Sequence, residues 1–426
     1  MASREKLTLL GSISLGTGVM IGAGIFALVG QVAELSGSLF PIAFLCGAIV
    51  ALASSHAYIR YSSVNPSSGG IAMLLKAAYG PGVVAGTFSM FMYVSMVIAE
   101  SLLARTFGTY LLRPFGLQDS LLLVPILGII AIAAAAFVNL RGNQFVENSA
   151  TTTAGLKIAG IATLAIAGLI ATAVGAGGAD SSSSSGPASL AGLLAGTTLC
   201  VLAYKGFTTI TNQGDDLKNP ERNIGRSILW SLAICTALYL LITISVQTTI
   251  GSKGAVDARD YALAEAADPV FGGWGVGLTV AIAVIATLSG LLASLYSVSR
   301  LYAMLQEMGQ APALPQRVEQ QPLLITAGLA IALTAFLDLS QIASIGAFLY
   351  LMMDIAVQWG MLRKLHEKTP AHRWILILTI ALDLAVLIPF AVLKARSDVI
   401  TIIVAAAVAA AIVVVQVVVA KAASRE

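Results

Sequence analysis

The chain has 426 residues, of which 58% are hydrophobic and 11% are charged, and its formal net charge is +3. Soluble domains carry about 25% charged residues, so this composition excludes a soluble protein and indicates an integral membrane protein. The three cysteines lie inside apolar stretches and the basic residues form no patch, so we expect no disulfide, no metal site and no nucleic-acid partner.

Apolar runs of about 20 residues recur along the whole chain, which predicts membrane-spanning helices, because the strands of a barrel would alternate. We expect an all-α protein of about 12 transmembrane helices in the cell membrane. The runs lie near residues 8–35, 39–61, 82–112, 121–139, 148–174, 189–212, 225–250, 271–304, 323–338, 341–363, 374–394 and 398–420.

The loops predict the orientation and leave little room for other activities. Lys and Arg gather in the loops on the side of the N-terminus, which predicts that both termini are cytoplasmic. Residues 252–268 predict a short helical lid on the outer side. No Walker lysine loop and no HExxH motif occurs, so we expect neither a pump driven by ATP nor an enzyme, and no cofactor.

Three glycines interrupt the first apolar run at Gly18, Gly22 and Gly24. Each weakens a helix by roughly 1 kcal/mol relative to alanine. One interpretation is a broken helix whose free backbone binds a ligand, as in secondary transporters. The other interpretation is close packing of helices through small residues.

The sixth run contains a similar interruption, Ala203-Tyr204-Lys205-Gly206-Phe207. Breaks five spans apart are typical of two inverted repeats of five helices that hold a substrate between the breaks. We therefore predict broken helices 1 and 6. The predicted organisation is a first repeat at 1–174, an external Ser-rich linker at 175–188, a second repeat at 189–363, and two further helices at 364–426.

Several motifs occur in the order that a known family shows. The motifs are Ile21-Gly22-Ala23-Gly24-Ile25-Phe26, Asn65-Pro66-Ser67-Ser68-Gly69-Gly70, Lys218-Asn219-Pro220-Glu221-Arg222-Asn223-Ile224, Ser299-Arg300-Leu301-Tyr302-Ala303-Met304, Gly309 and Leu314-Pro315. With them the chain resembles the amino acid–polyamine–organocation permeases, whose fold is similar to that of the leucine transporter. The chain departs from the family pattern at Arg60, Lys205 and Thr208 and in the pair Asp215-Asp216, which leaves the identity of the substrate open.

The two breaks are the predicted substrate site. Amides that lose their partners at the start of a half-helix attract a carboxylate, and freed carbonyls accept hydrogen bonds from an ammonium group. Tyr204 and Phe207 either cover the substrate as a gate or pack in the core. The predicted substrate-binding residues are Met20, Ile21, Gly22, Ala23, Gly24, Ile25, Leu202, Tyr204, Lys205, Gly206 and Phe207.

Lys157 lies about 14 Å inside the fifth run, if that helix begins nine residues earlier. A buried ammonium group needs a partner or water, whereas a lysine near the helix end would extend to the surface. The resemblance implies that Lys157 replaces the ion of sodium-coupled relatives. In that role it bridges span-one carbonyls near Gly18 and Ile21 to a hydroxyl of span eight, which Ser289 supplies, with Thr287 in reserve.

Lys205 and Glu100 are further candidate functional residues, because each is a charged residue inside an apolar run. Lys205 beside the substrate would repel a cationic side chain, which favours neutral or acidic amino acids, unless it points towards the cytoplasm. Glu100 either pairs with a lysine or transfers protons, or else lies near a wet surface with Arg105.

These observations predict a secondary transporter that moves amino acids with protons, independently of sodium, by alternating access. Its partners are then the amino acid, the proton and the lipid bilayer, while the oligomeric state is not predicted. The alternatives are an exchanger, or a carrier for a different solute such as a polyamine or an inorganic cation. A receptor or scaffold on the same fold is a further alternative, although the chain has no added soluble domain.

Overall fold

Helices account for nearly all of the regular structure in a computed structural model, of which we describe residues 6–67, 70–141, 144–175, 189–212, 214–312 and 320–423. Apart from its first residue, the predicted linker at 175–188 lies outside the described residues. The α-helices are α1 (Leu9–Ser36), α2 (Phe40–Val64), α3 (Gly70–Tyr79), α4 (Val83–Leu112), α5 (Leu123–Arg141), α6 (Gln144–Ala173), α7 (Leu190–Tyr204), α8 (Thr208–Thr211), α9 (Pro220–Thr249), α10 (Gly251–Asp257), α11 (Ala262–Phe271), α12 (Gly273–Glu307), α13 (Gln321–Phe336), α14 (Leu339–Gly360), α15 (Arg373–Ser397) and α16 (Val399–Ala423).

Each of the twelve predicted apolar runs coincides with one of these helices, or with α7 and α8 together. Ten helical stretches of the described residues are long and apolar enough to cross a membrane. One stretch, Gly24–Val64, contains α2 and part of α1, and Gln321–Phe336 is a shorter apolar helix. The all-α membrane fold is therefore confirmed.

Local sequence signals explain where several helices begin. The Thr8 side chain accepts a hydrogen bond from the amide of Gly11, and Ser189 does the same for Gly192, so both cap a helix start. Asp338 begins α14 with a full capping box, in which the Gln341 side chain bonds back to the Asp338 amide. These caps replace backbone partners that the first turn of a helix lacks.

Asp398 caps the last helix, between α15 and α16. Its Oδ1 accepts a hydrogen bond from the amide of Thr401 at 3.2 Å, and its Oδ2 accepts one from the Thr401 hydroxyl. Burial raises the pKa of this carboxyl, but the bonds from Thr401 and the nearby Lys394 together hold its pKa below the usual value. The cap is therefore strongest when Asp398 is ionised.

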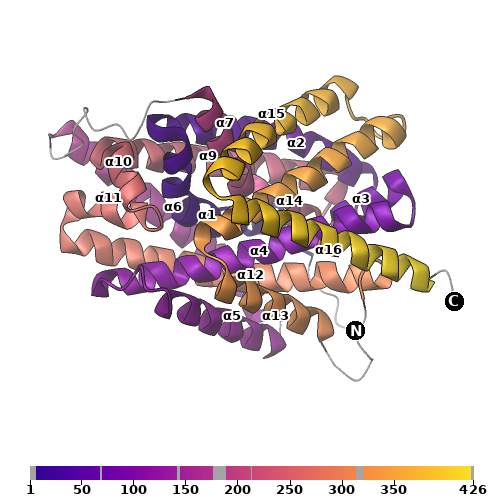
Figure 1. Cartoon of the computed structure of the whole chain (residues 1–426), viewed down its shortest axis with the longest axis horizontal. Helices are drawn as coiled ribbons and strands as arrows, with labels where there is room; N and C mark the ends of the chain where they lie inside the picture. The colour runs from indigo at the N-terminus through magenta and orange to yellow at the C-terminus, as the bar shows by residue number, and fades with distance from the viewer. Residues whose placement is uncertain are drawn as a thin grey trace.

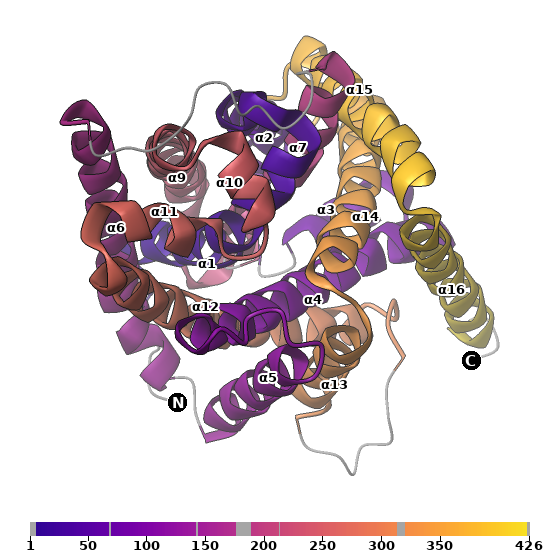
Figure 2. The same ribbon diagram turned by 60° about the vertical axis from the view of Figure 1, so that its left-hand side comes forward.

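The first helix is central to the arrangement. α1 packs against α6, α7, α9 and α12, and also touches α2 and α4. Figure 2 shows α1 in the interior, whereas α15 and α16 lie at the outer edge. The long helices in Figure 1 run mainly along the long axis, and both chain ends lie in its right half.

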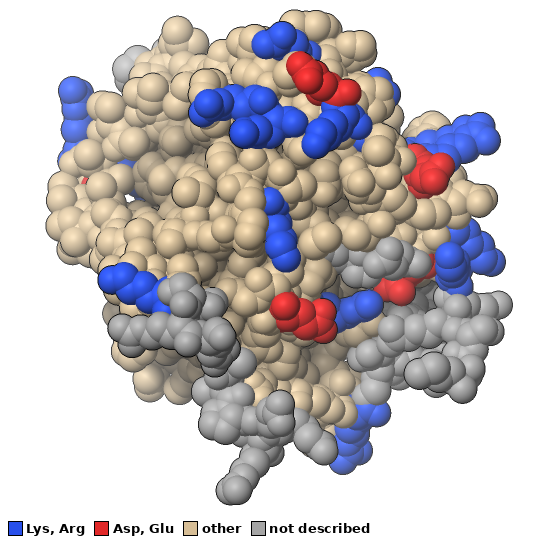
Figure 3. All heavy atoms as spheres, turned by 90° about the vertical axis from the view of Figure 1, so that its right-hand side faces the viewer, with Lys and Arg blue, Asp and Glu red and all other residues tan. Residues whose placement is uncertain are grey.

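The face turned to the right in Figure 1 is rich in basic side chains, because Lys and Arg outnumber Asp and Glu on it (Figure 3). Next to the start of α1, the Leu7 amide donates to the Asp216 carbonyl at 2.7 Å, and the Lys218 amide donates to the Leu7 carbonyl at 2.9 Å. Arg300 of α12 forms an ion pair with Asp216 at 3.0 Å. These contacts join α1, the segment after α8, and α12.

At the other end of α1, the predicted lid is formed by α10 and α11. Gly30 lies so close to the backbone of Arg259 that a side chain at Gly30 would collide with it. Arg259 forms an ion pair with Glu34 at 3.2 Å, and Gln31 donates to Asp260 at 2.8 Å. The lid therefore rests directly on α1.

Candidate functional site

The break predicted in span six is present. α7 ends at Tyr204, a 3₁₀ turn covers Lys205–Phe207, and α8 resumes at Thr208. Gly206 in this turn lies against α1, since a Cβ atom there would stand 2.7 Å from Cγ of Met20 and 2.9 Å from its amide nitrogen. Only glycine permits this approach of the two backbones.

The break predicted in span one is not formed in this structure, because α1 is a continuous helix from Leu9 to Ser36. The glycines instead allow close packing, which was the other interpretation of the pattern. A Cβ atom at Gly22 would lie 3.0 Å from Leu103, and one at Gly24 would collide with the Tyr239 hydroxyl. A membrane helix keeps its backbone hydrogen bonds inside itself, so close contacts can outweigh the low helix propensity of glycine.

Tyr239 of α9, which was not predicted as a site residue, connects α1 to α7. The Tyr239 hydroxyl of α9 donates to the Met20 carbonyl at 2.6 Å and lies 3.5 Å from the Ala203 carbonyl. Its ring packs on that of Tyr204, with centroids 5.0 Å apart. The available signal was a phenol group in the middle of the seventh apolar run, where a buried hydroxyl needs a partner.

Lys157 of α6 is buried, with 2% of its surface exposed, and therefore does not extend to the membrane surface. Its ammonium group donates to the Gly18 carbonyl of α1 at 3.2 Å. The hydroxyls predicted to complete a bridge to span eight bond within their own helix, Thr287 to the Ala283 carbonyl and Ser289 to the Ile285 carbonyl. The structure thus brings Lys157 to Gly18 and leaves Thr287 and Ser289 engaged elsewhere.

Lys205 points towards α4 and α14. Its ammonium group donates to the carbonyl and hydroxyl of Ser95 at 2.5 and 2.8 Å, and lies 5.9 Å from the centre of the Tyr350 ring. Ser95 in turn donates to the Gly346 carbonyl at 2.9 Å. The charge at the break therefore holds three helices together.

Glu100 of α4 is fully buried and accepts a hydrogen bond from Ser294 of α12 at 3.2 Å, while its Oε2 has no partner. Its carboxyl group interacts electrostatically with the Lys205 ammonium group. The alternative of a wet surface shared with Arg105 does not apply to a group with no exposed area.

The remaining predicted residues are buried apolar side chains around the same place. Phe207 packs edge-on against Tyr58 of α2, with ring centroids 5.6 Å apart. Ala23 lies within α1, but its side chain is outside the described set. Those in the core are Met20, Ile21, Ile25, Leu202, Tyr204 and Phe207.

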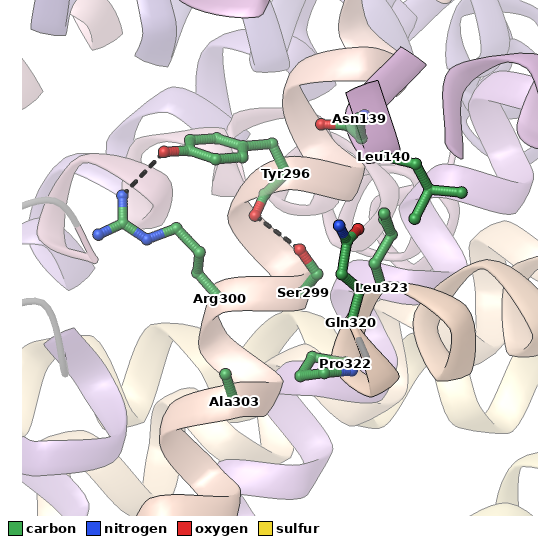
Figure 4. Close-up of a pocket in the computed structure, with 9 residues that line it drawn as sticks. All are labelled: Asn139, Leu140, Tyr296, Ser299, Arg300, Ala303, Gln320, Pro322 and Leu323. Carbon is green, nitrogen blue, oxygen red and sulfur yellow. Dashed lines mark hydrogen bonds between the residues drawn. The ribbon is translucent and has the colours of Figure 1, made fainter. Parts of the chain in front are cut away.

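A pocket of about 330 Å³ lies elsewhere, between α5, α12 and α13 (Figure 4). Asn139, Gln320 and Leu323 line it, and the Arg300 guanidinium group turns away to the Tyr296 hydroxyl at 3.1 Å. The pocket includes none of the predicted substrate-binding residues. Among the described residues, no group of three His, Cys, Asp or Glu side chains could hold a metal ion.

Comparison with known proteins identifies the family. A family model described as amino acid permease matches residues 7–424. The chain belongs to the amino acid permease family. This permease is 29% identical over 373 residues to the inner membrane transport protein YbaT of Escherichia coli, covering 85% of this chain and 84% of the relative.

Two further likenesses extend the comparison. The permease is 28% identical over 299 residues to the serine/threonine exchanger SteT of Bacillus subtilis, covering 68% of this chain and 65% of that protein. A solved structure of a mutant manganese transporter from Eremococcus coleocola gives a TM-score of 0.63 at 12% identity, covering 97% of this chain and 93% of that chain. The second likeness concerns the fold alone. The permease is therefore a multi-pass cell-membrane transporter of amino acids or related solutes, and not an enzyme.

Proposed function

We propose that the permease carries neutral or acidic amino acids into the cell together with protons and without sodium. The contact between the Lys157 ammonium group and the Gly18 carbonyl supports this proposal most directly. A charged ammonium group inside a membrane protein requires such a partner, and a hydrogen bond from a charged donor is about twice as strong as a neutral one. Loss of the proton therefore weakens the link between α6 and α1.

The substrate enters between α1 and the 3₁₀ turn. The Tyr239 hydroxyl donates to the Met20 carbonyl and lies near the Ala203 carbonyl, which are positions where an ammonium group would also donate. We propose that the substrate ammonium group replaces the Tyr239 hydroxyl there and separates Gly206 from Met20. Lys205, on the far side of the turn, disfavours a cationic side chain and leaves neutral or acidic ones.

The test begins with a thermal-shift screen of the purified protein against amino acids and polyamines, which identifies a ligand. Uptake of that ligand is then measured in proteoliposomes with an imposed pH gradient, with and without sodium. We expect uptake that the pH gradient accelerates and that sodium does not affect. In Lys157→Met, which keeps the length of the side chain, the acceleration by the gradient is lost.

Lys253→Met is the matched control, because Lys253 is an exposed lysine of α10. It is expected to keep the response to the gradient. Uptake that needs sodium and ignores the pH gradient would contradict the proposal. The similarity to a serine/threonine exchanger makes exchange the second candidate. Counterflow of labelled substrate without net uptake would support exchange instead.

A further inference from the structure

A second group of buried polar side chains lies between α2, α14 and α15. Asp354 of α14 and Asp383 of α15 are both fully buried inside apolar spans. None of the ion pairs among the described residues includes either carboxyl group. An isolated carboxylate at membrane depth costs several kcal/mol, so something must compensate two of them.

The two carboxyl groups differ in their hydrogen-bond donors. Oδ1 of Asp354 accepts a bond from the Tyr58 hydroxyl and another from Nε2 of Gln358 at 3.4 Å. Gln358 is held in place by a second bond to the Ser54 carbonyl at 3.2 Å. Oδ2 of Asp354 has no donor. The donors at Oδ1 of Asp354 are therefore those that an ionised carboxylate requires.

Asp383 has no donor at either oxygen. Its carboxyl group lies against that of Asp354. Two ionised carboxylates side by side repel each other, whereas one shared proton removes the repulsion. A proton on Asp383 turns it into a donor for the free Oδ2 of Asp354, which satisfies both groups at once.

A neighbouring hydroxyl also belongs to this group. Ser54 of α2 is fully buried, and its hydroxyl faces the Asp354 carboxyl group and the Tyr350 hydroxyl. A hydroxyl beside a carboxylate lowers the cost of the negative charge by donating to it. Ser54 therefore supports Asp354 as the member of the pair that stays ionised.

We propose that Asp354 and Asp383 form a proton-binding pair, in which Asp383 carries the proton and donates it in a hydrogen bond to Asp354. The pair joins α15 to α14, and Tyr58 joins both to α2. The site is separate from Lys157 and does not depend on which substrate is carried. Release of the proton leaves two negative charges in contact, so we expect α2 and α15 to be held less firmly to α14.

The titratable groups that face the pair are Tyr58 from α2 and Tyr350 from α14 itself. Lys205 reaches the other side of this group, since its ammonium group lies over the Tyr350 ring, 5.9 Å from the centre of the ring. The Tyr58 ring also contacts Phe207 of the 3₁₀ turn. The proton site is thus one layer of side chains behind the proposed substrate site.

Infrared difference spectroscopy of the purified, lipid-embedded protein tests the assignment through the C=O band of protonated carboxylic acids. At neutral pH we expect such a band in the wild type, and we expect Asp383→Asn to lose its main component. Asp354→Asn should keep this component at a higher frequency, because the amide oxygen of asparagine is a weaker hydrogen-bond acceptor than a carboxylate. An unchanged band in Asp383→Asn would overturn the proposal.

Two controls separate other sources of the signal. Glu100→Gln removes a third carboxyl group that is fully buried among the described residues, and the Asp383 component should persist in this variant. If the component appears only after sodium is replaced by a bulky organic cation, an alkali ion occupies the pair and the proposal fails.

Should the Asn variants not fold, Tyr58→Phe keeps the ring and removes one donor to Asp354. The band must then shift, and an unshifted band overturns the proposal.

Discussion

Substitution of Gly24 by alanine separates the two interpretations of the glycines in α1. Alanine is the better helix former by about 1 kcal/mol, so the substitution would stabilise an unhindered helix. Here the new methyl group collides with the Tyr239 hydroxyl and lies 2.9 Å from Cβ of Ala203. An extra methyl group in a packed core costs about 1–3 kcal/mol.

Neither neighbour of Gly24 can move easily, because Tyr239 is hydrogen-bonded to Met20 and Ala203 is part of α7. The packing cost should therefore lie near the upper end of its range, and the net loss of stability should be about 2 kcal/mol. Unfolding in mixed detergent micelles measures this value. Tyr239→Phe in the same chain removes the colliding oxygen, so the double variant should recover part of the loss.

Gly328→Ala is the matched control, because Gly328 is in the interior of α13 and a Cβ atom there meets nothing within 4 Å. It should stabilise the protein by about 0.5–1 kcal/mol. If Gly24→Ala proves as stable as Gly328→Ala, close packing is not the role of Gly24. The reasoning on α1 would then be refuted.

Three further predictions concern other contacts. Lys205→Met removes both hydrogen bonds to Ser95 and the charge that repels a cationic substrate side chain. Without about 1.5 kcal/mol of this repulsion, cationic amino acids should compete for uptake about tenfold better. Unchanged competition would contradict the proposed selectivity. Asp216→Ala removes a partly exposed ion pair with Arg300 between the segment after α8 and α12. The equilibrium between closed and open conformations at this end of the permease should shift towards the open one by about twofold. Thiol labelling of a cysteine introduced at this end measures the shift. Asp398→Ala should cost about 0.5–1 kcal/mol at neutral pH. This difference disappears as the pH falls through the depressed pKa of Asp398, and melting curves across that range check it.

The helices and the second break could be predicted because their signals are local. Hydropathy over about 20 residues decides whether a segment crosses the membrane. A glycine beside a charged residue in an apolar run marks a place where a regular helix is unfavourable. The turn Lys205–Phe207 was predicted on this basis. The family motifs also implied the contact of Lys157 with the Gly18 carbonyl.

The direction of the side chains required the tertiary structure. Lys205 turns to Ser95 of α4 because the carbonyl and the hydroxyl of Ser95 both accept hydrogen bonds from its ammonium group. The sequence around these two positions does not indicate the contact. In the sequence, Asp354 and Asp383 are two acidic residues in separate apolar runs. Only the packing of α14 on α15 brings them together as a pair.

By itself, the sequence determined that this is a helical membrane transporter with an interrupted sixth span, because burial in lipid and helix propensity act within one segment. Only the tertiary structure decided that Gly22 and Gly24 serve close packing in a continuous α1. The same glycines suit a broken helix and a tightly packed one. The choice depends on whether neighbours such as Tyr239 and Leu103 occupy the space beside them, and those neighbours come from distant parts of the chain.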